Sequence, residues 1–168
     1  MTNLDIFAIK ERIVSILKAD TTNLWDSTPS SRTKFRKIEA GAPSPKSSQE
    51  PPLPRLWVTS DVNVATNVRT LAQISANAHV GEEWELNLAI FFVVEAKDGP
   101  KTEEDIDDFS KAIIEQLETN YDLRSVGGAE STRLAESSQI KGIQDLPQIF
   151  KGDRVRGRVI KFKVIVRA

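Results

Sequence analysis

Three groups of side chains in this sequence have the chemistry to form a site: one histidine, one acidic cluster and one basic segment. The histidine is His79 and cysteine is absent, which excludes a disulfide, a thiolate nucleophile and zinc sites built from cysteines or paired histidines. His79 stands beside a predicted turn without an evident orienting partner, so we do not expect it to act as a general base. Motifs such as G-x-x-x-x-G-K-[ST] and G-x-S-x-G are missing. The sequence therefore predicts no catalytic residue, no cofactor and no enzyme activity.

The acidic cluster lies near the start of a predicted helix. It comprises Glu103, Glu104, Asp105, Asp107 and Asp108, and its spacing lacks the alternating acidic pattern of a calcium-binding loop. The positive end of a helix dipole stabilises acidic side chains in the first turns. That stabilisation explains the cluster without a bound ion, so no metal site is predicted.

The basic segment belongs to the last predicted strand, where Arg154, Arg156 and Arg158 alternate and should share one face. Three interpretations stay open. The arginines cover a solvated strand end, where charge discourages aggregation, or they contact nucleic acid. In the third, they face Glu104 and Asp108 of a neighbouring copy in a head-to-tail ring.

The composition suits one globular domain. The chain has 168 residues, of which 39% are hydrophobic and 28% charged, and its formal net charge is −1. Such a balance gives no overall attraction to nucleic acid or to an acidic surface. The N-terminus lacks the layout of a signal peptide, and no apolar run has the length of a membrane span. We therefore expect a protein that is made and used in a cytoplasm.

Two helices are expected to carry much of the core. Ile6, Ile9, Ile13 and Leu17, widened by Phe7, Val14 and Ile16, predict an amphipathic helix over 3–19, capped by Thr2 or Asn3. A second helix is predicted over 102–119, opened by a capping box of Thr102 and Asp105.

The remaining pattern predicts strands and loops. Strands are expected over 55–59, within 68–74, over 83–97 and at the C-terminal end, where a change of parity indicates a bulge near 157–160. The segment 121–150 is expected to contain short strands at most. Residues 20–54, rich in Pro and Ser, are expected to bury little and to form a flexible excursion from a single domain over 1–168.

The long strand over 83–97 carries apolar residues on both of its faces. In its first part polar and apolar residues alternate, with Glu85 and Asn87 on the face expected to meet solvent. Further along the strand, Ala89, Phe91 and Val93 make that same face apolar. A strand that is apolar on both faces needs a cover on each. We expect helices to cover one face, and the long loop or a neighbouring subunit to cover Ala89, Phe91 and Val93.

The order of these elements resembles that of the tail-terminator (tail-completion) proteins of long-tailed viruses of bacteria and archaea. The likeness rests on the N-terminal helix, PRLWV at 54–58, the long strand EWELNLAIFFVVEA, the helix at 102–119 and the final strand RVIKFKVIVRA. It covers most of the chain apart from 20–54 and much of 121–150. The resemblance implies an α+β fold with a mostly antiparallel, curved sheet and two main helices packed on one face. It also implies a hexameric ring that caps the tail tube, ends tail elongation and offers the head side a joining surface.

The resemblance further implies which partners to expect. They are other copies of the chain, the tail-tube protein and a neck or head-completion protein, at the head-proximal end of the virion tail and in the host cytoplasm during assembly. DNA would be met only as it passes through the ring, and no membrane is involved. Two alternatives stay open: a neck or head-completion subunit, and a nucleic-acid-binding module that uses the basic C-terminal strand.

Overall fold

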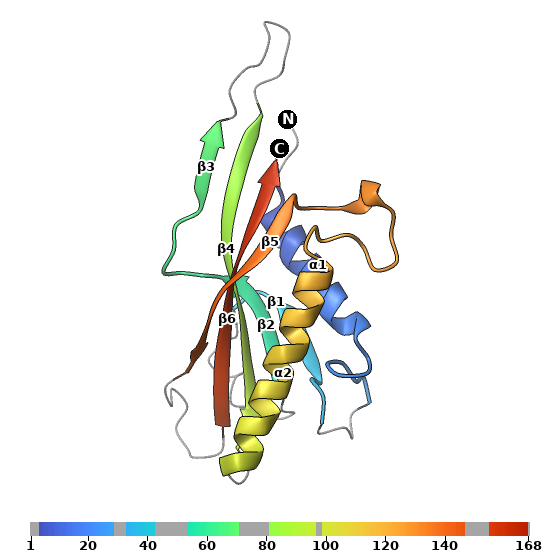
Figure 1. The fold of residues 1–168 in the computed structure, drawn as a ribbon, viewed down its shortest axis with the longest axis vertical. Helices are drawn as coiled ribbons and strands as arrows, with labels where there is room; N and C mark the ends of the chain where they lie inside the picture. The colour runs from blue at the N-terminus through green and yellow to red at the C-terminus, as the bar shows by residue number, and fades with distance from the viewer. Residues whose placement is uncertain are drawn as a thin grey trace, which may run out of the picture.

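The fold is an open sheet of six strands with two helices, described by a computed structural model over residues 4–28, 33–42, 54–70, 81–96, 99–146 and 155–167 (Figure 1). The strand order is β1-β2-β4-β6-β5, and β3 also pairs with β4. In chain order the elements are α1 (Ile6–Ala19), β1 (Lys37–Ala40), β2 (Arg55–Ser60), β3 (Asn67–Thr70), β4 (Glu82–Glu95), α2 (Gly99–Thr119), the short 3-10 helix η1 (Glu130–Thr132), β5 (Ser137–Asp145) and β6 (Val155–Arg167).

Both helices pack on the same face of this sheet. One continuous core cluster joins the apolar sides of α1 and α2 to alternate residues of β4, among them Leu88, Ile90 and Phe92. Residues of β6 with the same parity, Ile160 and Phe162, complete the cluster. The predicted α+β fold with helices on one face is therefore confirmed, and we refer to the two sides of the sheet as the helix face and the far face.

Strand β4 is the longest strand of the sheet and organises it. Its second half pairs with β2, from Ser60 opposite Leu88 to Arg55 opposite Val93, and its first half pairs with β3. On its other side, β4 pairs with β6 along nearly the full length of both strands. Only β1 and β2 are parallel, and the other pairs are antiparallel.

The helix starts differ from the predicted ones. Asp5 is the N-cap of α1, since its Oδ1 accepts a hydrogen bond from the N–H of Ala8 at 2.9 Å, in place of Thr2 or Asn3. Helix α2 begins at Gly99, so Thr102 lies inside the helix and does not cap it. The acidic cluster is consequently further from the helix start than the sequence indicated. The end of α2 before Asn120 agrees with the prediction.

The strands at the C-terminal side correct two predictions. Strand β6 pairs with β4 without a shift of register, so the bulge predicted near 157–160 is absent from this pair. The change of parity arises because Val159 faces Phe91 on the far face while Ile160 enters the core on the helix face. The bulge lies in β5, at Lys141 between Ile140 and Gly142. Strand β5 also has nine residues, where only short strands were expected.

The described parts of the 20–54 excursion contribute to the core. Leu24, Phe35 and Ile38 are fully or almost fully buried, and Phe35 packs against Phe109 of α2 with ring centroids 4.3 Å apart. Strand β1 pairs with β2. The prediction that this segment buries little is therefore wrong for these residues, and positions 29–32 and 43–53 lie outside the described residues.

Candidate functional site

Arg158 is a predicted interface residue whose side chain makes three hydrogen bonds inside the chain. Its side chain is only 11% exposed and lies on the helix face, between α2 and β5. Nη1 donates to Asp107 Oδ1 at 2.7 Å and to Ser110 Oγ at 3.1 Å, and Nε donates to Asp145 Oδ1 at 2.7 Å. Arg158 thus joins the end of β5 to α2, and its charge is balanced by two carboxylates.

The environment of Arg158 stabilises its charged form. Burial by itself lowers the pKa of this guanidinium, but the hydrogen bonds and charges of Asp107 and Asp145 outweigh burial and raise the pKa above its ordinary value. The hydrogen bonds of Arg158 use Nε and Nη1, so a phosphate that bound Nη2 would lie beside the negative charges of Asp107 and Asp145. Among the three predicted arginines, Arg154 lies outside the described residues and Arg156 is exposed.

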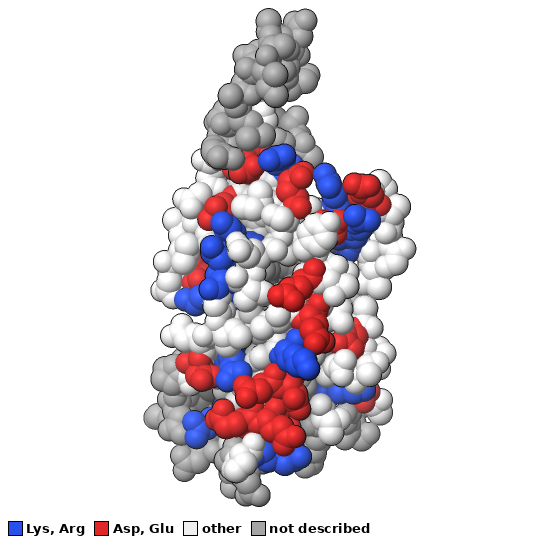
Figure 2. Space-filling model, viewed as in Figure 1, with Lys and Arg blue, Asp and Glu red and all other residues white. Residues whose placement is uncertain are grey.

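Glu104 and Asp108, the acidic half of the predicted interface, are exposed on α2. Figure 2 shows acidic side chains gathered over the N-terminal half of α2, with basic side chains interspersed among them. Asp107, which precedes Asp108 in the acidic cluster, forms the ion pair with Arg158. The basic strand and the acidic helix, predicted as surfaces of two neighbouring copies, therefore already meet within one chain.

The apolar middle of β4 is covered without a second subunit. Val93 is completely buried and Ala89 is 6% exposed on the far face, while Phe91 is half-buried. Phe91 packs against Trp57 of β2, with ring centroids 5.4 Å apart. Neither α1 nor α2 contributes to this cover, because both helices pack on the other face. The two-sided burial seen in the sequence is real, but at Ala89 and Val93 it needs no neighbouring copy.

Beside the first half of β4, the far face carries charged side chains. Lys163 pairs with Glu85 at 3.4 Å, and Arg167 pairs with Glu83 at 3.1 Å. Asn87 donates its side-chain N–H to the carbonyl of Ala65 at 3.0 Å. The polar first half of β4 that the sequence indicated therefore forms cross-strand ion pairs and polar contacts.

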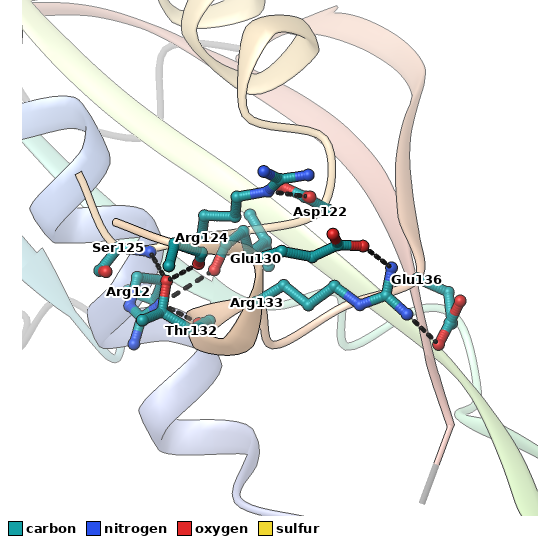
Figure 3. A network of polar contacts seen from close by, with 10 residues as sticks. Arg12, Asp122, Arg124, Ser125, Glu130, Thr132, Arg133 and Glu136 are labelled. Carbon is teal, nitrogen blue, oxygen red and sulfur yellow. Dashed lines mark hydrogen bonds and ion pairs between the residues drawn. The ribbon is translucent and has the colours of Figure 1, made fainter. Parts of the chain in front are cut away.

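A separate polar network fastens the segment between α2 and β5 to α1 (Figure 3). Arg12 donates from Nη1 to the carbonyl oxygens of Leu123 at 3.0 Å and Thr132 at 2.7 Å. Leu123 is fully buried and has a φ of 52°, which side-chain-bearing residues seldom adopt. Burial of Leu123 and the hydrogen bond to its carbonyl hold this strained residue in place, which gives the network a structural role.

Asp122 is an acidic residue of this network with a clear pKa shift. Burial raises its pKa, but the hydrogen bond from Arg124 Nε and the positive charge of Arg124 outweigh burial and hold the pKa below its ordinary value. The carbonyl of Asp122 also accepts hydrogen bonds from the N–H groups of Leu134 and Ala135.

No metal-binding group is found in the described ranges, where three or more His, Cys, Asp or Glu side chains never gather in a suitable arrangement. His79 lies outside these ranges. The helices of the described structure include none that is long and apolar enough to cross a membrane.

A groove with both apolar and polar lining residues at one edge of the sheet was not anticipated from the sequence. It lies between α1 and β1, has a volume of about 600 Å3, and is lined by Phe7, Glu11, Val14, Ser15, Lys18, Ile38, Glu39 and Ala40. Phe7, predicted as part of the buried stripe of α1, is 54% exposed beside this groove. A single apolar residue at the margin of an amphipathic stripe does not reveal whether it faces a core or a groove.

Comparisons with known proteins returned no match, either to a protein-family model or to a curated protein. The function is therefore inferred from the residues, the fold and the resemblance in element order.

Proposed function

We propose that this chain is a virion structural protein, without enzyme activity, that forms a ring capping the tail tube of a long-tailed virus. In this role it ends tail elongation and provides the surface to which the head side joins. The observation that carries the proposal is an open sheet with both helices on one face and, among the described residues, no strand on its outer edges at β1 and β5. Unpaired strand edges favour pairing with another chain.

The arrangement of charges supports an assembly role over a nucleic-acid-binding one. Of the arginines considered for DNA contact, Arg158 already forms ion pairs with Asp107 and Asp145 within the chain. The surface of α2 beside it carries exposed acidic residues, which repel phosphate.

Deletion of the gene from the viral genome that encodes the chain tests this proposal. We expect tails of irregular length that are not joined to heads, with complementation by the chain supplied from a plasmid. Electron microscopy of lysates measures tail length and joining. Tails of normal length without heads would instead assign the chain to the neck or to head completion, and intact virions from the deletion strain would refute both roles.

A further inference from the structure

The two outer edges of the sheet differ, since one borders a groove and the other carries an exposed apolar side chain. One edge is β1, whose helix face is flanked by the groove along α1. The other edge is β5, which carries Ile143 with half of its side chain exposed. Among the residues that the structure describes, no strand or loop pairs with the outer side of either β1 or β5.

The outer side of β1 has backbone groups available for a further strand. Arg36 donates its N–H to the carbonyl of Pro54, towards β2, whereas Phe35 donates to Leu24 on the opposite side. Within β1 the alternation is set by Gly41, whose N–H donates to the carbonyl of Val58 in β2. Since successive residues of a strand point their N–H and C=O groups to opposite sides, Ile38 and Ala40 direct theirs away from β2. Trp25 occupies this outer side only opposite Phe35, just before β1 begins.

The groove beside β1 suits an apolar side chain from a paired strand. Phe7, Glu11, Val14 and Lys18 follow one another along α1 at helical spacing and form one wall. Ile38 and Ala40 of β1 form the other. A strand added beside β1 would place its helix-face side chains directly over this groove.

Strand β5 presents the matching side chain. Ile143 lies opposite Ile160 of β6, which belongs to the core, so Ile143 is on the helix face. The exposed Lys141 of β5 and the exposed Glu11 of the groove make no ion pair in the described structure, and Lys18 already lies over the ring of Trp25 at 4.8 Å. Lys141 therefore complements Glu11, whereas Glu39 already pairs with Lys37 at 3.0 Å.

The direction of the strands permits this pairing in a ring. Strand β1 runs with β2, and the antiparallel steps through β4 and β6 make β5 run opposite to β1. If successive copies in a ring are related by rotation about an axis parallel to the strands, their strands keep the same direction. Their helix faces also stay on the same side of the ring wall. The β5 edge of one copy would thus meet the β1 edge of the next antiparallel, with the two helix faces on the same side.

We propose that copies of this chain join edge to edge, with β5 of one copy pairing antiparallel to β1 of the next and Ile143 entering the groove between α1 and β1. The contact joins two different surfaces, so it repeats from copy to copy and can close into a ring. The inference deepens the proposed ring-forming function and rests on it.

Engineered cysteines test this contact directly, because the chain has none of its own. Glu39→Cys and Gln144→Cys place one thiol on each edge, both on the far face. With a short bis-maleimide, the double variant should give a ladder of crosslinked species. Each single variant should give none, and an equimolar mixture of the two should give a dimer. Crosslinking of Glu39→Cys alone would indicate symmetric β1–β1 pairing and overturn the proposal.

Two charge substitutions test the role of Ile143. In the double-cysteine background, Ile143→Asp should reduce crosslinking by about tenfold or more, since the groove would have to bury an unpaired carboxylate. Val126→Asp is the matched control, because Val126 is similarly exposed, at 58% against 50% for Ile143, and lies outside both edges. Circular dichroism checks that both variants are folded. Equal ladders from the two variants would exclude the groove contact.

The outcomes separate this contact from the viral function. Closed rings in native mass spectrometry without crosslinking would overturn the edge pairing and leave the ring intact. A ladder in a chain whose gene deletion leaves virions normal would support the pairing and refute the tail function. A chain that stays monomeric at millimolar concentration, without a ladder, would overturn the pairing.

Discussion

Arg158 illustrates how one side chain can connect three elements. It belongs to β6 and reaches Asp107 of α2 and Asp145 of β5, while Ser110 Oγ accepts from it and donates to the carbonyl of Ile106. The two carboxylates are 68% and 72% exposed, so water can solvate them if the arginine is lost. The loss should therefore be moderate and should not unfold the protein.

We predict that Arg158→Ala lowers the free energy of unfolding by about 1–2 kcal/mol, from lost charge-assisted hydrogen bonds and lost packing of the aliphatic stem. Arg158→Lys should lose less, because it keeps the charge but lacks the planar fork that meets both carboxylates. Urea denaturation measures both. Arg156→Ala is the control and should change stability by less than about 0.5 kcal/mol, since Arg156 is exposed. Equal losses at 156 and 158 would contradict the assigned contacts.

Asp122 makes the stability of the protein depend on pH in the acidic range. Its folded-state pKa is depressed by Arg124, so its contribution is complete above the pKa of an unfolded aspartate, about 3.9. The contribution is lost as the pH falls through the lower, folded-state pKa. Acidification below pH 4 should therefore weaken the network around Asp122.

We predict that Asp122→Asn has a lower Tm than the wild type at pH 7, and that this difference shrinks as the pH falls below 4, as measured by thermal denaturation across pH. Glu130→Gln is the control, because Glu130 is 72% exposed and lies 3.8 Å from Arg133. It should behave like the wild type at each pH. A difference for Asp122→Asn that stays constant down to pH 2 would show that the carboxylate charge is not the stabilising factor.

Strand β6 contains a glycine because its neighbours come close on the far face. A Cβ at Gly157 would lie 2.9 Å from Leu146 Cδ1, 3.0 Å from the carbonyl oxygen of Phe92 and 3.2 Å from Val93 Cγ1. Gly142 in β5 offers a contrast, since a Cβ there would meet nothing within 4 Å. The same substitution should thus have opposite effects in two adjacent strands.

We predict that Gly157→Ala lowers the free energy of unfolding by about 1–3 kcal/mol, because the carbonyl of Phe92 cannot move without disturbing β4. Gly142→Ala should be neutral or stabilise by up to about 1 kcal/mol, through reduced entropy of the unfolded chain. Chemical denaturation of both variants and the wild type under identical conditions measures these changes in the free energy of unfolding. If Gly157→Ala is as stable as Gly142→Ala, the close approach is not rigid.

The elements with long, regular patterns could be predicted from sequence, and the irregular ones could not. Helix α2 and strands β4 and β6 are 13 residues or longer, and each carries many apolar residues along its length. Strand β5 was missed because the bulge at Lys141 separates Ile140 and Ile143 by three residues, which breaks the alternation. Strand β1 has four residues, too few to show a period.

The candidate site was predicted only in part, for a different physical reason. The sequence indicated that basic and acidic clusters are complementary, but complementarity does not specify whether they meet within a chain or between chains. Arg158 and Asp107 meet within the chain because β6 pairs beside β4, directly below α2. Phe7 and Ile143 could be identified as groove and edge residues only after the fold had placed them.

For the molecule as a whole, edge pairing couples assembly to stability. Association that involves only the folded state stabilises it by mass action, so the Tm should rise with protein concentration. We predict that calorimetry over a thousandfold range of concentration shows this rise for the wild type and for Val126→Asp. Ile143→Asp should keep a nearly constant Tm over the same range, because its edge residue no longer enters the α1–β1 groove. A Tm that rises equally in Ile143→Asp would place the stabilising contact on another surface of the molecule.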